Sequence, residues 1–557
     1  MDRRDFLAVK RKPSKKTKIL SPVFRTESGI NEFTGLWTVN EVTHLLKRTM
    51  FGAKKTDVDY FLGKTMAASV DELLNPTAPL PSGPVKDYDP SSASTPDINI
   101  LAGQVWVNDN NTDGTVSSLR RNSFRKWWTG RMINQDRSIR EKMTMFWHNH
   151  FPTEANDVSN SQFVYKYHAL LRSNALGNFK SLVRAVSIDL AMLRYLNGYL
   201  NTASAPDENY ARELQELFTI GKENSPNYTE DDVKAAARVL TGWQTDAVNI
   251  TSTFNINRHD KTNKVFSSFY SGTAITGITD ATAGDKELDA LLAMIFNKKA
   301  EVSKFIVKKL YRWFVYYDID ATTETNVILP LAQILQDNNW EIKPVLAALF
   351  KSEHFYDAIN SGCVIKSPVD LIISVCREYN LVFADEVTDY ATAYAQWSYI
   401  FNWMVVMAQA PGDPPNVSGW AAYYQLPQFY ELWINSDTLP KRNQFTDLMI
   451  STGFTKNSKK VIIDPIAFAN TLSNPGDPNV LINDSLTILF KIDITQASKD
   501  LIKKQILLSG QDVDYYWTNA WLLYKQTPTD TVAKNTVLTR LQLLYKYFMN
   551  LAEYQLS

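Results

Sequence analysis

The residues best suited to chemistry include two histidines near the end of the segment FWHNHF at 146–151. Neutral imidazole is the commonest metal ligand in proteins. His148 and His150 are therefore predicted ligands of a divalent metal such as zinc, iron or manganese. An ideal helix points residues i and i+2 to different sides, so chelation by both requires the segment to unwind. The alternative is an aromatic core segment whose histidines are hydrogen-bonded.

A carboxylate lies beside the apolar stripe of the next distinctive segment, ENYARELQELFTIG at 208–221. Glu213 is three residues after Tyr210, which belongs to that stripe. A carboxylate that faces a core must be paired, metal-bound or protonated. We expect Glu213 to act as a metal ligand or general base, with Asn209 and Arg212 binding substrate. The alternative is an interior ion pair between Glu213 and an arginine that fixes helix packing.

A third candidate is the adjacent pair His259 and Asp260 within Arg258-His259-Asp260-Lys261. An aspartate can orient a histidine as a general base, and the pair can also hold a metal. We therefore predict a catalytic role for both residues. The alternative is a solvated turn.

His44 and Arg48 are one helical turn apart, on the side away from Val42, Leu45 and Leu46. Their side chains could bind an anion or a carboxylate, so they are predicted substrate-binding residues. The alternative is a partly exposed polar helix face.

The elements that must position these residues are mostly helices. Thr38-Val39-Asn40-Glu41 and Ser138-Ile139-Arg140-Glu141 match the capping box that begins a helix. Ser367-Pro368 predicts another helix start, with proline in the first turn. Residues 250–285 lose the helical period, and FNINRHDKTNKVF predicts a small β-hairpin or irregular β element around 250–270. The fold prediction is mainly α, a large multi-helix domain with that β insertion.

Composition bounds the function classes. The 557 residues include 59 basic and 59 acidic side chains, a balance that argues against a dedicated nucleic-acid binder. The sequence contains no run approaching the roughly 18 apolar residues of a membrane span. We divide the chain into a basic tail at 1–35, a helical core domain at 36–450 and a C-terminal helical extension at 451–557. The start RRDFL resembles a twin-arginine export signal, but the apolar stretch that should follow is missing.

Nine segments in this order resemble one large bacterial family, catalogued as domain of unknown function 1800. The resemblance covers roughly residues 36–550. The segments are HLLKRTMFGA (44–53), KMTMFWHNHF (142–151), ENYARELQELFTIG (208–221), YTEDDVKAAARVLTGW (228–243), RHDKTNK (258–264), KFIVKKLYRWFV (304–315), KSPVDLIISVCR (366–377), PPNVSGW (414–420) and WINSDTLPKR (433–442).

The resemblance implies a mainly helical fold and, for many family members, export to the periplasm or cell surface. It also implies a partner, a second exported family that resembles sulfatases and phosphatases. The family as a whole has no established activity. The family-like positions are His44, Arg48, His148, His150, Asn209, Arg212, Glu213, His259, Asp260 and Lys366.

Two functions from different classes follow from these observations. The first is a metal-assisted hydrolase in which the metal lowers the pKa of a bound water toward neutrality. The second is a non-catalytic helical protein that binds a partner or a polymer, or that acts as a scaffold with an exported partner. In the second, the same histidines and carboxylates are members of buried networks that specify packing.

Overall fold

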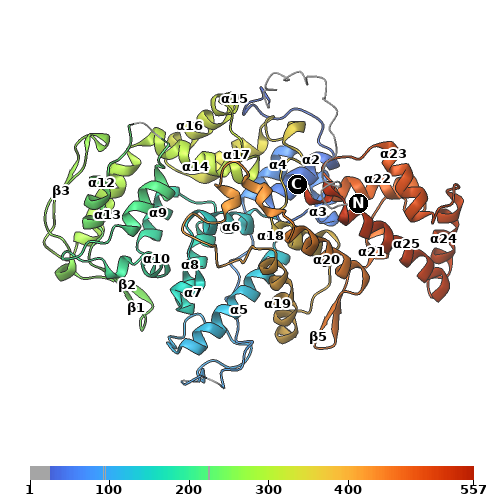
Figure 1. The fold of residues 1–557 in the computed structure, drawn as a ribbon, viewed down its shortest axis with the longest axis horizontal. Helices are drawn as coiled ribbons and strands as arrows, with labels where there is room; N and C mark the ends of the chain where they lie inside the picture. The colour runs from blue at the N-terminus through green and yellow to red at the C-terminus, as the bar shows by residue number, and fades with distance from the viewer. Residues whose placement is uncertain (1–25, 92, 95, 224–225) are drawn as a thin grey trace, which may run out of the picture.

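The computed structural model describes residues 26–557 except 92, 95, 224 and 225. The predicted mainly helical class is confirmed: helices make up most of the described chain (Figure 1). The strands of the described residues form three separate two-stranded antiparallel sheets, and none of these forms a layer of the core. The RRDFL start lies outside the described residues.

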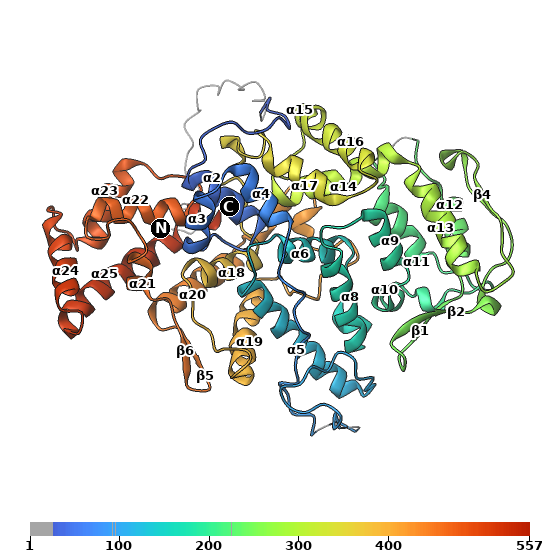
Figure 2. The same cartoon turned by 180° about the vertical axis from the view of Figure 1, so that it is seen from behind.

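The middle of the molecule is built from the N-terminal helices and the helices of residues 299–406. Figures 1 and 2 both place α6 near the centre of this body. Its helices are α2 (Val39–Thr49), α3 (Lys55–Leu62), α4 (Met66–Leu74), α5 (Gly114–Ile133), α6 (Arg140–His150), α7 (Ala155–Val158), α8 (Ser161–Ser173), α14 (Lys299–Phe314), α15 (Ala321–Thr323), α16 (Leu329–Asp337), α17 (Ile342–Lys351), α18 (Pro368–Glu378) and α19 (Tyr390–Val406). Between α15 and α16 the chain forms a π-helical turn, η5 (Glu324–Ile328).

One end of the molecule is a lobe that carries four of the strands (Figure 1, green). Its helices are α9 (Phe179–Ser187), α10 (Leu190–Tyr195), α11 (Asn209–Glu213), α12 (Glu230–Val239) and α13 (Ala283–Phe296), with α11 continuing into a π-helical segment, η2 (Leu214–Thr219). Its strands form two hairpins, β1 (Trp243–Asp246) with β2 (Thr251–Phe254), and β3 (Lys264–Val265) with β4 (Ala274–Ile275). The predicted β element is therefore present, but the two ends of FNINRHDKTNKVF pair with other strands.

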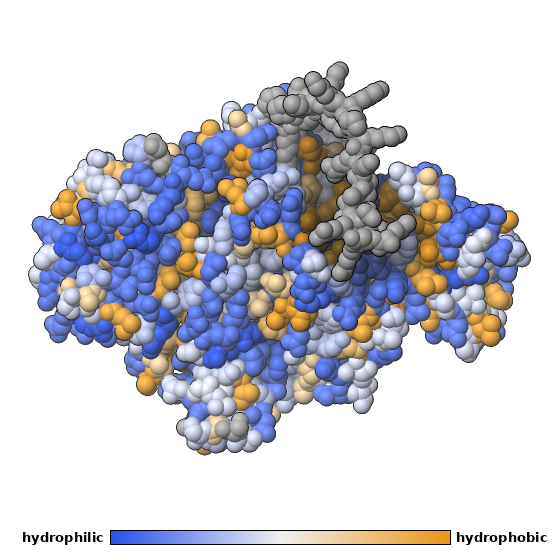
Figure 3. Space-filling view, viewed as in Figure 1, coloured by the Kyte–Doolittle hydropathy of each residue, from blue (hydrophilic) through white to orange (hydrophobic). Residues whose placement is uncertain are grey.

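The opposite end consists of the C-terminal helices (Figure 2, red). Several apolar side chains on α24 and α25 are exposed, and Figure 3 shows hydrophobic patches on this end. The elements are α20 (Thr438–Ser451), β5 (Phe454–Lys456), β6 (Lys459–Val461), α21 (Pro465–Ala469), α22 (Pro478–Leu489), α23 (Gln496–Ile502), the π-helical turn η9 (Lys503–Leu507), α24 (Tyr515–Gln526) and α25 (Thr531–Asn550). Sequence periodicity did not predict the β5–β6 hairpin.

The helix starts show where local sequence decides structure. Thr38 and Glu41 form the predicted capping box of α2, and Ser367 caps α18 with Pro368 in its first turn. The capping box predicted at Ser138 is wrong: α6 begins after Ile139, and although Ser138 Oγ accepts the Arg140 backbone N–H at 3.4 Å, the reciprocal bond from Glu141 is not made. Glu141, which should have closed that box, instead forms a buried ion pair with Arg172.

The described part of the predicted tail is attached to the body. Phe33 N donates to Lys351 O, and Gly29 N donates to the Glu353 carboxylate.

The structure also offers no candidate for a bilayer-spanning helix within residues 26–557, the four omitted positions aside.

Candidate functional site

Six of the distinctive segments meet at two small neighbouring cavities in the middle of the molecule, which share the side chains of Arg312, Trp313 and Tyr423. The cavity volumes are about 30 and 20 Å³. We call them together the basic cleft. Its lining comprises Lys47, Arg48, Lys142, Phe146, Asn149, His150, Lys309, Arg312, Trp313, Tyr317, Val364, Ile365, Ser367, Asp370, Ser418, Ala422, Tyr423, Tyr424, Phe429, Tyr430, Trp433 and Ser557.

The charge of the basic cleft is strongly one-sided, although the whole chain is neutral. Two of its five cationic side chains are neutralised. Lys47 forms a buried ion pair with Glu378, and Lys142 pairs with Asp370. Asp370 is the one carboxylate side chain among the described residues of the lining. The three further cations have no carboxylate of the lining as an ion-pair partner, and the nearby carboxylate of Glu223 only partly opposes the effect of burial on Lys309 and Arg312.

The three remaining cations are Arg48, Lys309 and Arg312, and none forms an ion pair within the described part of the chain. Arg48 Nη2 donates to the carbonyl of Asn360 at 3.1 Å, while its buried Nε has no hydrogen-bond partner among the described residues. Arg312 Nε donates to the carbonyl of Tyr317 at 3.2 Å. Backbone carbonyls satisfy some donors of these groups without cancelling their charge.

Burial makes the positive charges of the basic cleft costly. Desolvation, together with repulsion from Arg312, lowers the pKa of Lys309 from 10.5 to about 8. Desolvation likewise lowers the pKa of Arg312 below its usual range. A bound anion would oppose both effects, since a nearby negative charge favours the charged form of a base.

The cavity volumes limit what can bind. A single water needs roughly 10–15 Å³ of such space, so the larger cavity, of about 30 Å³, has room for a small oxyanion. Trp313 and Tyr423 form one wall, with ring centroids 4.3 Å apart. These volumes exclude a whole sugar ring and leave room for no more than a small group, such as a single phosphate, sulfate or carboxylate.

The local sequence explains why the segments 142–151 and 414–420 pack closely against each other at the basic cleft. Asn149, near the end of α6, accepts a hydrogen bond from the backbone N–H of Trp420 at 2.9 Å. Gly419, the residue directly before Trp420, has φ +83°, and a Cβ there would lie 2.4 Å from Asn149 Oδ1. Only glycine allows this close approach, which places Ser418 in the lining.

The two predicted histidine ligands have separate surroundings, because α6 remains helical through residue 150. His148 packs against Trp128 and Trp420, with ring centroids 5.3 and 6.2 Å away. His150 Nε2 lies 3.1 Å from the carbonyl oxygen of Phe218. Burial lowers the pKa of His148 to about 3 and that of His150 well below 6.5. Both rings are therefore neutral members of an aromatic core.

Glu213, Arg212 and Asn209 lie on α11, in the lobe. Arg212 forms ion pairs with Glu208 at 3.0 Å and Glu230 at 2.6 Å. Desolvation and repulsion by Glu216 raise the pKa of Glu213 to about 7. Asn209 is the first residue of α11, and its backbone N–H donates to the Asp207 carboxylate at 2.9 Å.

His259 and Asp260 are also in the lobe, and their side chains contact different partners. His259 Nδ1 lies 2.9 Å from the Thr241 carbonyl, and its Nε2 lies 3.1 Å from the Glu287 carboxylate. Asp260 accepts a hydrogen bond from Arg238 Nε at 2.7 Å. The expected arrangement, in which the aspartate orients the histidine, is wrong: Glu287 faces the imidazole.

Sequence reasoning missed Glu287, which also forms a buried ion pair with Lys264 at 2.5 Å. A signal was available, because Glu287 is four residues before the buried Leu291 on the apolar face of α13.

The predicted metal centre stays a prediction. Within the described ranges, no group of three or more histidine, cysteine, aspartate or glutamate side chains is placed to hold a metal ion.

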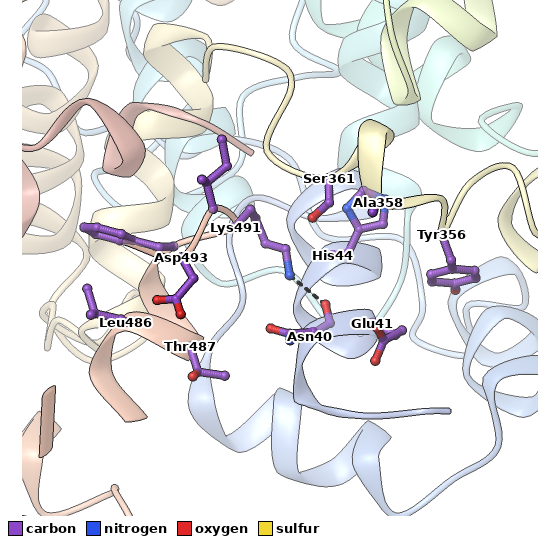
Figure 4. A pocket seen from close by; sticks show the side chains of 12 residues that line it. Asn40, Glu41, His44, Tyr356, Ala358, Ser361, Leu486, Thr487, Lys491 and Asp493 are labelled. Carbon is purple, nitrogen blue, oxygen red and sulfur yellow. Dashed lines mark hydrogen bonds between the residues drawn. The ribbon is translucent and has the colours of Figure 1, made fainter. Parts of the chain in front are cut away.

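His44 and Arg48 lie on the same helix but reach different cavities. Arg48 lines the basic cleft, whereas His44 lines a larger polar cavity of about 330 Å³ between α2 and the end of α22 (Figure 4). His44 Nε2 lies 2.9 Å from the carbonyl oxygen of Phe355. Lys366 lies outside both cavity linings and is buried, with its Nζ 4.1 Å from the ring centroid of Tyr554.

The cations Lys309 and Arg312 were missed although they lie in a quoted segment, KFIVKKLYRWFV. The available signal was charge within a helix face that also carries Phe305 and Trp313. Their lack of carboxylate partners is a property of the folded chain, so the sequence alone could not reveal it.

Comparison with known proteins gives one match. A family described as "Protein of unknown function (DUF1800)" matches residues 44–556. No curated protein and no solved structure matches the chain.

Proposed function

The chain belongs to this family of unknown function, DUF1800, and we propose that it binds a small oxyanion, or an oxyanion group of a larger ligand, in the basic cleft. The chemical class is a phosphate, sulfate or carboxylate. Arg48 and Arg312 would donate hydrogen bonds to the oxygens, and Lys309 would supply further positive charge.

One observation carries the proposal: Arg48, Lys309 and Arg312 line one cleft, and none forms an ion pair with a described residue. Removing an ion from water costs several kcal/mol unless a counter-charge compensates. Two other buried lysines of the chain have such partners, since Lys47 pairs with Glu378 and Lys264 with Glu287. An exogenous anion would serve as the missing partner.

Oxyanion binding is required by both functions that the sequence suggests, the metal-assisted hydrolase and the non-catalytic binding protein. A hydrolase would need the cleft to hold the anionic group of its substrate, and a binding protein would need it to hold its ligand. A metal-assisted reaction would also need ligands from His148, His150 or Glu213, and these three side chains have separate surroundings. The geometry therefore supports oxyanion binding best.

An oxyanion ligand also fits the predicted sulfatase-like exported partner. Enzymes of that kind act on sulfate or phosphate esters, so both proteins would recognise the same chemical group. This partnership is part of the proposal and rests on the family resemblance.

The test is the thermal unfolding midpoint in sodium phosphate, sodium sulfate and sodium chloride at matched ionic strength. A ligand that binds only the folded state stabilises it by about 2.7 kcal/mol at 100 times its Kd. We expect phosphate or sulfate to raise the midpoint above its value in chloride.

Arg312→Gln should abolish most of this rise. Arg184→Gln is the matched control, because Arg184 is a half-buried arginine outside the basic cleft that pairs with Asp285 and Asp289. Equal midpoints in all three salts, or an equal response in the parent and Arg312→Gln, would overturn the proposal.

A further inference from the structure

A second cavity, separate from the basic cleft, lies where the N-terminal helix α2 meets the chain that leaves α22 (Figure 4). We call it the α2–α22 cavity. Its volume of about 330 Å³ is at the lower end of the range for small-molecule sites, roughly 300–1,000 Å³. The α2–α22 cavity therefore has room for a molecule of monosaccharide size, which the basic cleft has not.

Two aromatic side chains of the lining carry polar atoms that have no partner. His44 Nδ1 and Tyr356 Oη are both buried, and neither forms a hydrogen bond with any described residue. The two rings are adjacent, with centroids 6.1 Å apart, and Figure 4 shows His44 between Tyr356 and Lys491. Because buried polar groups of native proteins usually have a partner, these two atoms point to a ligand that hydrogen-bonds to both.

The hydrogen-bonding roles of the two atoms are defined by their surroundings. The Phe355 carbonyl can only accept, so His44 Nε2, which lies 2.9 Å away, carries the ring proton. Burial, with repulsion from Arg48 and Lys491, lowers the pKa of His44 well below 6.5, and Nδ1 of the neutral ring is an acceptor. Burial raises the pKa of Tyr356 well above 10, so its hydroxyl keeps a proton to donate. The ligand must therefore donate to His44 and accept from Tyr356.

Lys491 offers the ligand one further hydrogen bond. Its Nζ donates to the carbonyl oxygen of Asn40 at 2.6 Å and to Thr43 Oγ1 at 2.8 Å. An ammonium has three N–H donors, so one remains. Burial, followed by repulsion from Lys47, lowers the pKa of Lys491 to about 7, and the neutral amine has a lone pair in place of that N–H. A hydroxyl group pairs with either form, because it both donates and accepts.

The charges of the α2–α22 cavity are balanced, unlike those of the basic cleft. Its lining includes the cationic Lys491 and two carboxylates, those of Glu41 and Asp493. Glu41 attracts Lys491, and Asp493 pairs with Lys499 at 2.9 Å. An anionic ligand would meet both carboxylates, and a cationic ligand would meet Lys491. The balance favours a ligand without net charge.

From these contacts we infer that the α2–α22 cavity binds a neutral polyhydroxylated molecule, a monosaccharide or a cyclic polyol. One ligand hydroxyl would donate to His44 Nδ1, a second would accept from the Tyr356 hydroxyl, and a third would pair with Lys491. Hydroxyl groups suit this lining because a single ligand of this class supplies both donors and acceptors. His44, predicted from the sequence to bind an anion, would then bind an uncharged ligand.

The experiment is a titration of the full chain with D-glucose, D-galactose, D-mannose and myo-inositol in chloride buffer, with binding measured by saturation-transfer difference NMR. Sodium gluconate, an anionic relative of glucose, is the charged probe. We expect saturable binding of at least one of the neutral compounds and weaker binding of gluconate.

Tyr356→Phe removes one oxygen and retains the ring, so we expect it to fold and to bind the same compound about fivefold more weakly, or less. Tyr228→Phe is the matched control, because the Tyr228 hydroxyl is also buried without a partner among the described residues but lies outside this cavity. His44→Phe should also weaken binding, since it removes the acceptor.

Absence of saturable binding for all the neutral compounds would overturn the inference, as would equal affinities in the parent and Tyr356→Phe. Tighter binding of gluconate than of the neutral compounds would also overturn it, because the ligand class would then be anionic. These results are independent of phosphate or sulfate binding at Lys309 and Arg312, so failure here leaves the proposed function of the basic cleft unaffected.

Discussion

Replacing Lys309 by methionine is expected to stabilise the protein at pH 7 in chloride buffer, although the change removes a charged residue from the proposed site. Burial and the neighbouring Arg312 lower the pKa of Lys309 from 10.5 to about 8. At pH 7 the amine is charged in both the folded and the unfolded chain, so the folded state bears the full penalty. One pKa unit corresponds to about 1.4 kcal/mol, which makes about 3 kcal/mol an upper bound.

Lys309 as a whole is half-buried, so we expect a gain of about 1–2 kcal/mol after screening. This predicted increase in stability is the reverse of the usual expectation, which is that a substitution at a buried site destabilises the protein. As the pH rises from 8 to 10.5, the folded chain loses its proton before the unfolded chain does. The stability of the parent therefore increases over this interval, and the advantage of the variant shrinks.

The assay is urea unfolding of parent and variant at pH 7 and pH 9.5 in chloride, repeated at pH 7 with phosphate. Lys534→Met, at an exposed position on α25, controls for the loss of one charge. Phosphate should stabilise the parent more than Lys309→Met. A variant less stable than the parent at pH 7, or an equal difference at both pH values, would refute the reasoning.

Three further predictions test other contacts. Lys47→Met should cost about 3–5 kcal/mol in urea unfolding, because it leaves the buried Glu378 carboxylate unpaired; a loss below 1 kcal/mol contradicts this. Gly419→Ala should lower both the unfolding midpoint and the phosphate response, since its Cβ would lie 2.4 Å from Asn149 Oδ1; an unchanged response argues against this positioning. Although burial alone raises it, hydrogen bonds from Arg238 and Thr262 lower the pKa of Asp260 from 3.8 to about 2. Its stabilisation should therefore be complete above about pH 4 and lost as the pH falls toward 2, and acid titration of Asp260→Asn should lack this component.

Sequence patterns predicted the fold where the decisive contacts are local. The capping box of α2 depends on Thr38 and Glu41 alone, three residues apart. The same pattern at Ser138 failed because Arg172, 31 residues after Glu141, takes the carboxylate. The β5–β6 hairpin turns at Asn457 and Ser458, both with positive φ, and that two-residue turn signal was available in the sequence.

The candidate site was predictable only in part. Of the predicted site residues, Arg48 and His150 line the basic cleft, whereas Glu213 and His259 lie in the lobe. Their roles could not be read from type and spacing. The ring of His150 is held in an aromatic core. The proposed site depends instead on Lys309 and Arg312, and their lack of an ion pair with any described residue follows from how distant segments pack.

The most direct test of oxyanion binding is a crystal structure of the parent protein grown with selenate, a tetrahedral analogue of sulfate with an anomalous signal. The proposal predicts an anomalous peak in the basic cleft, with selenate oxygens within hydrogen-bond distance of Arg48 and Arg312, and its loss in Arg312→Gln. A cleft without a peak, in crystals that bind selenate elsewhere on the protein, would contradict it.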